Sequence, residues 1–252
     1  SATLGQANAA LQAGRPDEAV GLLTDLSAKH PGDRAILGAL GDALRVAKKC
    51  PEAIKVYGQA IATIAKPAPG DWPLWYRRAG CLQLTEDWPG AEKDLQFALT
   101  LAPDEPRLLN ELGYTWVDRG QNLDQALEML RRAVAGAPDQ GYILDSLAWA
   151  YYRLGRYPEA VEPQEKASLL MPNDPVVTDH LGDIYWMVGR KREAEYQWHR
   201  ALSFSPDEKD AVRIRLKLEQ GLDAVLATEK ANGGKADGGK ADGKTDGGKN
   251  AR

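Results

Sequence analysis

Several features of catalytic and metal-binding proteins are missing from this sequence. It has three histidines, and none lies at ligand spacing from a cysteine or from another histidine. The patterns H-E-x-x-H, C-x-x-C and G-x-S-x-G do not occur. Glycine-rich sequence is confined to the C-terminal end, where no helix follows to bind a phosphate group. We therefore expect no enzyme activity, no catalytic residues, no metal site and no cofactor.

Long apolar runs and strong positive charge are also missing. No stretch of eighteen consecutive apolar residues occurs, so no transmembrane helix is predicted within this sequence. The formal net charge is −4, which provides no electrostatic footprint for a nucleic acid. These observations favour a helical protein that binds neither nucleic acid nor small phosphorylated ligands.

What the sequence does contain is a proline that returns at a nearly fixed distance. Pro103, Pro138, Pro172 and Pro206 are separated by 35, 34 and 34 residues, and Pro31 begins the same series further upstream. A fixed period of this size indicates stacked supersecondary units, each of which buries its apolar face only against its neighbours.

Small residues recur in the same register as the prolines. One series is Ala19, Ala53, Ala91, Ala126, Ala160 and Ala194. A second series lies upstream of the first, at Ala7, Gly41, Ala79, Gly113, Ala148 and Gly182. Two antiparallel helices per unit explain this pattern, because small residues are needed where two helices approach closely.

Glycine and proline mark the turn between the two helices of each unit. The glycines that can end a first helix with a positive φ are Gly14, Gly120, Gly155 and Gly189. The prolines that can begin a second helix, where a missing N–H is tolerated, are Pro16, Pro51, Pro89 and Pro158.

Two segments carry a resemblance to a known family. Leu109–Trp116 matches the first half of the tetratricopeptide repeat signature, and Leu181–Tyr185 followed by Ala194, Trp198 and Pro206 matches nearly all of it. The chain therefore resembles the tetratricopeptide repeat family. The resemblance implies an all-α, right-handed α-solenoid of about six repeats, at residues 1–33, 34–67, 72–105, 106–140, 141–174 and 175–208.

Some positions depart from the repeat pattern. Repeat 2 has Ala65 where its proline is expected, and a small insertion follows at residues 66–71. Repeat 3 has Arg78 at a leucine position, so its first helix should be less well buried. Repeat 4 has one extra residue near Asn122, and Pro163 should kink or loosen the second helix of repeat 5.

The sequence changes character after the sixth repeat. An apolar stripe that includes Val212, Leu216, Leu222 and Leu226 predicts one capping helix at residues 209–228. Residues 229–252 are rich in glycine, lysine and aspartate, and their composition predicts a disordered tail.

The two cysteines are interpreted from their places in the repeats. Cys50 lies just before a second helix and Cys81 lies inside a first helix. We expect free thiols rather than a disulfide, and the cysteines do not fix a cellular compartment.

Repeats 4 to 6 resemble, more narrowly, a group of long bacterial tetratricopeptide proteins. Residues 141–157 and 179–191 carry this resemblance. Because members of that group are longer and often exported, and because the sequence begins at Ser1, we expect a C-terminal part of a longer protein. The resemblance implies the bacterial cell envelope, on the periplasmic side, with the cytoplasm as the alternative.

The resemblance also implies a function, a scaffold that binds a protein or peptide in the concave groove lined by the first helices. Carried over to this sequence, the groove positions are Arg77, Arg107, Asn110, Tyr114, Tyr142, Asp145, Trp149, Tyr152, Asp179, Asp183 and Trp186. Aromatic and charged residues of this kind are typical of binding hot spots. Because acids replace several positions of the carboxylate-binding clamp found in some members, we expect a basic or mixed partner of unknown identity, and self-association stays open.

Two other functions are compatible with the sequence. One is an RNA-binding helical repeat, which would need a basic groove. The other is the interaction module of an enzyme whose N-terminal region precedes this sequence.

Overall fold

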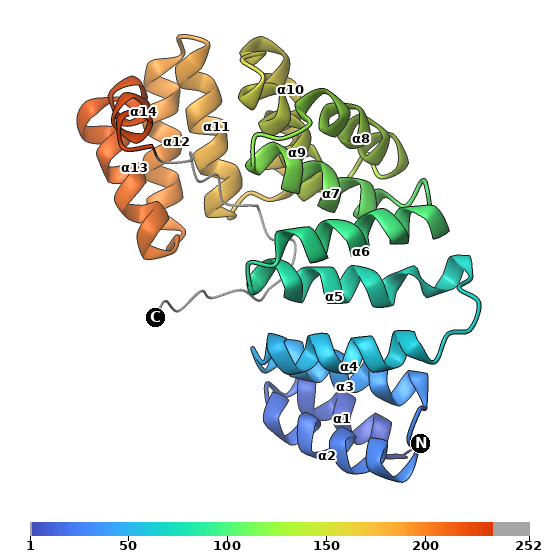
Figure 1. The fold of residues 1–252 in the computed structure, drawn as a ribbon. Coiled ribbons are helices and arrows are strands. Elements are labelled where there is room, and N and C mark those ends of the chain that lie inside the picture. Colours follow the sequence, from blue (N-terminus) through green and yellow to red (C-terminus); the bar gives the residue numbers. More distant parts are fainter. Residues whose placement is uncertain (1, 234–252) are drawn as a thin grey trace. The chain divides into compact units, whose positions relative to one another are not determined.

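The computed structural model describes residues 2–233, and these residues contain only helices (Figure 1). The chain divides into two compact units, an N-terminal unit (residues 1–103) and a C-terminal unit (residues 104–252). In both units consecutive helices pair as helix–turn–helix hairpins. The prediction of an all-α repeat array is confirmed.

The N-terminal unit contains six α-helices and one short 3₁₀ helix. They are α1 (Ala2–Gln12), α2 (Pro16–Lys29), α3 (Arg34–Val46), α4 (Cys50–Ala62), η1 (Pro69–Asp71), α5 (Trp72–Leu84) and α6 (Trp88–Leu101). The described part of the C-terminal unit contains eight α-helices. They are α7 (Pro106–Asp118), α8 (Leu123–Gly136), α9 (Gly141–Arg153), α10 (Tyr157–Leu170), α11 (Pro175–Met187), α12 (Lys191–Ser203), α13 (Glu208–Gln220) and α14 (Leu222–Ala231).

The turns inside the repeats use the predicted left-handed backbone position. The four glycines at this position, Gly14, Gly120, Gly155 and Gly189, have φ values of 69°, 64°, 72° and 85°. Repeats 2 and 3 have Lys48 and Glu86 there, with φ values of 60° and 63°. The turn geometry is therefore kept even where a side chain makes it less favourable.

The small residues lie at close helix–helix contacts, as predicted. All six alanines of the first series are completely buried. At Gly182 an added Cβ would lie 2.4 Å from Nε1 of Trp198, and at Gly41 it would lie 2.5 Å from the ring of Tyr57. A methyl group does not fit at either glycine, because the neighbouring ring belongs to the partner helix of the same hairpin.

Repeat 3 also agrees with its prediction. Helix α5 buries five residues, whereas α3 buries seven and α7 buries nine. Arg78 donates from Nε and one Nη atom to the two carboxylate oxygens of buried Asp94, both at 2.7 Å. The arginine at the leucine position is therefore accommodated by a bidentate ion pair. The other departure, Pro163, lies inside α10 and does not break that helix.

The C-terminal end differs from the prediction of one capping helix. Two helices, α13 and α14, are separated by Gly221, which has a φ of 84°. A Cβ at this glycine would lie 2.8 Å from the ring of Trp186, so only glycine fits both the backbone and the contact. Residues 229–231, predicted to begin the tail, belong to α14, and the rest of the predicted tail from residue 234 lies outside the described residues.

Candidate functional site: a cleft between helices α3 and α5

The predicted groove residues of the C-terminal unit are mostly buried. Arg107 is exposed, and Tyr142, Asp179 and Trp186 are partly buried. The buried residues are Asn110, Tyr114, Asp145, Trp149, Tyr152 and Asp183. The expectation that these six side chains face outward is wrong, and their contact with a partner stays a prediction without the accessible surface that it needs.

Trp149 and Asp145 of α9 pack against the next repeat. The Trp149 ring stacks on His180 with centroids 3.9 Å apart and on Tyr152 with centroids 4.4 Å apart. Oδ1 of Asp145 accepts a hydrogen bond from Nε2 of Gln164 at 2.7 Å and lies 2.9 Å from Nδ1 of His180. These side chains therefore join α9, α10 and α11 rather than line an open surface.

The acids of α11 are neutralised by the C-terminal helices. Nζ of Lys217 lies 2.5 Å from Oδ1 of Asp179 and 2.6 Å from Oδ1 of Asp183. Arg213 pairs with Oδ2 of Asp183 at 3.3 Å and with Glu229 at 2.7 Å. Burial raises the pKa of Asp179, whereas Lys217 and Arg213 outweigh burial and lower the pKa of Asp183. The acids that suggested a basic partner thus have internal cations, and this premise is corrected.

The buried imidazole of His180 predicts a pH dependence of stability. Burial lowers its pKa, but the charge and hydrogen bond of Asp145 outweigh burial, and the pKa is raised. A raised folded-state pKa contributes stability that is complete below the unfolded value of about 6.5 and is lost as the pH rises through the folded value. We expect urea unfolding followed by tryptophan fluorescence to show this loss. His180→Gln should remove that part of the pH slope, and an unchanged slope would contradict the assignment.

One predicted groove residue, Arg77, lies at an open cleft within the N-terminal unit. The cleft has a volume of about 400 Å³ and lies between α3 and α5. Its lining residues are Arg34, Ala35, Gly38, Ala39, Asp42, Gly70, Asp71, Pro73, Leu74 and Arg77. We call this feature the α3–α5 cleft.

A long interhelical link forms one wall of the α3–α5 cleft. The links at residues 30–33, 137–140, 171–174 and 204–207 each have four residues, whereas α4 and α5 are joined by residues 63–71. Oδ2 of Asp71 accepts a hydrogen bond from the Ala68 N–H at 2.9 Å, which closes the turn that includes η1. The predicted insertion is therefore part of the site, because Gly70 and Asp71 line the cleft.

Small residues leave space between the two helices. Ala35, Gly38, Ala39 and Gly70 have no side-chain atoms beyond Cβ, and they make up much of the lining. A Cβ at Gly38 would lie 3.7 Å from Cδ2 of Leu74, an ordinary van der Waals distance. The cleft is thus narrow, and backbone from a ligand could approach helix α3 closely.

Two arginine–aspartate pairs provide the charge in the cleft. Nη1 of Arg34 lies 2.9 Å from Oδ1 of Asp71, and Nη1 of Arg77 lies 3.0 Å from Oδ2 of Asp42. The Tyr57 hydroxyl donates to Oδ1 of Asp42 at 2.7 Å. Burial and the neighbouring Asp42 charge raise the pKa of Tyr57, so this hydroxyl remains a donor at neutral pH.

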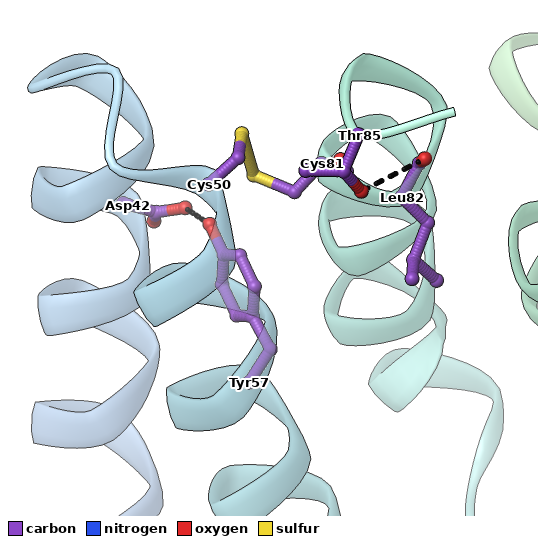
Figure 2. Close-up of a disulfide and its surroundings, with 6 residues drawn as sticks. All are labelled: Asp42, Cys50, Tyr57, Cys81, Leu82 and Thr85. Carbon is purple, nitrogen blue, oxygen red and sulfur yellow. Dashed lines mark hydrogen bonds between the residues drawn. A yellow bond between two sulfur atoms is a disulfide. The ribbon is translucent and has the colours of Figure 1, made fainter. Parts of the chain in front are cut away.

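A disulfide joins the repeats on either side of the α3–α5 cleft. Cys50 at the start of α4 is bonded to Cys81 in α5, with Cα atoms 5.1 Å apart, and the expectation of free thiols is wrong (Figure 2). Both cysteines are buried. Residues 63–71 connect the two repeats before α5 begins, and Cys81 lies one helical turn beyond Arg77. The cleft therefore has a covalent connection near each end of α5.

Sequence reasoning missed the cleft because it concentrated on aromatic residues in repeats 4 to 6. The available signal was the insertion at residues 66–71, together with arginines at both the start and the middle of neighbouring first helices. The cysteine pair also gave a signal, since the start of a second helix faces the first helix of the following repeat.

Comparison with known proteins decides the family. The tetratricopeptide repeat family model matches residues 4–71, 85–140 and 117–175, which together make up more than half of the chain. The chain belongs to the tetratricopeptide repeat family. Proteins built from these repeats are generally protein-interaction modules.

Three relatives illustrate the similarity. The TPR repeat-containing protein PA4667 of Pseudomonas aeruginosa is 35% identical over 182 residues, which cover 72% of this chain and 30% of that protein. A tetratricopeptide repeat protein of Parabacteroides merdae has 20% identity and a TM-score of 0.70, with 92% of this chain and 91% of that chain covered. YrrB, described as a TPR protein with an unusual peptide-binding site, has 17% identity and a TM-score of 0.56, covering 77% of this chain and 97% of that one. The two structures support the fold alone, and the chain spans less than a third of the length of PA4667.

Two further searches concern membranes and metals. Among residues 2–233, no helix has the length and apolar character to cross a membrane. The same residues contain no group of three or more His, Cys, Asp or Glu side chains arranged to hold a metal ion.

Proposed function

We propose that this chain is a protein-interaction module that holds an extended segment of a partner protein in the α3–α5 cleft. The observation that carries the proposal is the cleft itself, which has about 400 Å³ of open space and half-exposed arginines at its rim. A volume of this size is within the usual range for ligand sites of roughly 300 to 1,000 Å³. YrrB, a structural relative described as having a peptide-binding site, supports the proposal by analogy.

We further propose that binding occurs without catalysis. The carboxylates of Asp42 and Asp71 are each paired with an arginine, so neither is placed to act as a general base. No serine, cysteine or histidine lines the cleft. The lining thus offers hydrogen bonds and charge but no nucleophile.

The Cys50–Cys81 disulfide supports an oxidising compartment for this module. Disulfides persist in secreted and periplasmic proteins and are rare in the cytosol of most cells. A location on the periplasmic side of a bacterial envelope agrees with the bond between these buried sulfurs.

Selection from a random peptide library tests the proposed function. Peptides that bind the oxidised chain would be labelled, and their affinity measured by fluorescence anisotropy. Ala35→Trp should fill the cleft from its rim and weaken the selected peptides by about tenfold or more, the equivalent of about 1.4 kcal/mol. Ala28→Trp is the matched control, because Ala28 is also an exposed helical alanine but lies on α2 away from the cleft.

The two variants separate the outcomes. Loss of affinity in Ala35→Trp with an unchanged Ala28→Trp supports binding in the cleft. Equal affinities for both variants would place the peptide elsewhere, and failure to select any peptide would overturn the proposed function.

A further inference from the structure

We propose that the segment held in the α3–α5 cleft is acidic, with glutamate or aspartate side chains flanked by small residues. This inference rests on the proposed function and adds the chemistry of the partner. It reverses the partner expected from the sequence, which was basic or mixed.

The first step is that both carboxylates of the cleft are already satisfied. Asp71 accepts from Arg34 at Oδ1 and from the Ala68 N–H at Oδ2, both at 2.9 Å. Asp42 accepts from Tyr57 at Oδ1 and lies 3.0 Å from Arg77 at Oδ2. All four carboxylate oxygens therefore have a donor, and a basic ligand would have to displace one of them.

The second step is that the arginines keep unused donors. A guanidinium has five N–H groups. Within the described part of the chain, Arg34 and Arg77 each form one ion pair, through a single Nη1 atom. Their side chains are 50% and 41% exposed. The remaining hydrogen-bonding capacity of the cleft is therefore mainly donor capacity, and it carries positive charge.

The third step is that these donors match carboxylates. Charge-assisted hydrogen bonds from guanidinium to carboxylate are among the strongest in proteins and are often bidentate. Asp42 and Asp71 hold the two guanidiniums in place, which lowers the conformational entropy that a ligand must remove on binding. Each arginine can thus keep its aspartate while its free N–H edge receives an acidic side chain.

The fourth step concerns size. The lining between the arginines consists largely of Ala35, Gly38, Ala39 and Gly70. Such a floor admits the backbone of a ligand with glycine or alanine beside its acids, but a narrow cleft leaves little room for bulky neighbouring side chains. The occupant is therefore an acidic, small-residue segment inside a partner protein.

Synthetic peptides test this inference on the full oxidised chain. The probes are acetylated and amidated peptides of about ten glycine and alanine residues that carry two glutamates, two glutamines or two lysines. A fourth peptide has no glutamate but a free terminal carboxylate. We expect the glutamate peptide to bind about tenfold or more tightly than each of the others, with affinity that falls as salt is raised.

Variants then place the binding. Arg34→Gln with Arg77→Gln should weaken the glutamate peptide by about tenfold or more. Arg15→Gln with Lys55→Gln removes the same charge from exposed positions of the same unit outside the cleft and should change affinity less than about twofold. Circular dichroism and melting curves check that both double variants are folded.

The outcomes distinguish this inference from the proposed function. Stronger binding of the lysine, glutamine or free-carboxylate peptide would overturn the acidic segment. So would equal losses in the two double variants. If library peptides bind the cleft but the glutamate peptide does not, the proposed function stands and the inference fails.

Discussion

Replacing Lys217 with methionine should destabilise the C-terminal unit by about 3 to 5 kcal/mol. The Lys217 side chain is completely buried and contacts the carboxylates of Asp179 and Asp183 at 2.5 and 2.6 Å. Its ammonium also lies 5.2 Å from the centroid of the Trp198 ring. Methionine keeps the approximate length of the side chain but removes the cation, so two carboxylates share the site with Arg213 alone. Urea unfolding followed by tryptophan fluorescence measures the loss.

Matched variants isolate the electrostatic cause. Lys230→Met, at an exposed position of α14, should change the free energy of unfolding by less than about 0.5 kcal/mol. Adding Asp179→Asn and Asp183→Asn to Lys217→Met should restore part of the lost stability, because the unpaired negative charge is gone. A loss below about 1 kcal/mol in Lys217→Met would contradict the buried ion cluster.

Removing the disulfide should have the second largest effect. Cys50 and Cys81 are 31 residues apart in sequence, and the bond closes a loop that contains α4, the long link and most of α5. In the chain-entropy account, closing a loop of this length stabilises the folded state by about 3 to 4 kcal/mol. We expect Cys50→Ala with Cys81→Ala to lower the stability of the N-terminal unit by this amount in thermal or urea unfolding.

Reducing agent provides the control for this second prediction. The native chain should lose stability after complete reduction, whereas the double alanine variant should not respond to the reductant. Two free thiols in the unfolded, unreduced chain, or equal stability of the native chain and the variant, would contradict the bond. The variant should also bind the peptides selected on the cleft more weakly, because the bond joins the two repeats that form it.

The repeated pattern made most of the fold predictable. Close helix contacts require small residues, and turns require positive φ, so Gly41, Gly182, Gly155 and Gly189 revealed the helix pairs. The break at Gly221 was missed because apolar residues continue at helical spacing on both sides of it. The decisive contact there is the ring of Trp186, and sequence spacing does not show that the two meet.

The candidate site was less predictable than the fold. Repeat register places Trp149 and Asp145 on the face that the next repeat approaches, but it does not state how much of them the neighbour covers. His180 and Gln164 cover both, since their ring and amide fit the space between helices. In the N-terminal unit small residues occupy such space instead, and the α3–α5 cleft stays open.

Partners distant in sequence explain the remaining errors. Asp183 is neutralised by Lys217, 34 residues away, and Cys50 is bonded to Cys81, 31 residues away. Neither pair follows from local pattern alone, because each depends on how one repeat stacks on the next.

The most direct test is an amide ¹H–¹⁵N titration of the full oxidised chain with a peptide selected on it. Binding in the α3–α5 cleft predicts that the largest shift changes fall on residues 34–42 and 70–77, with side-chain Nε–H changes at Arg34 and Arg77. Changes centred on α7, α9 and α11, with these residues unmoved, would contradict the cleft as the binding site.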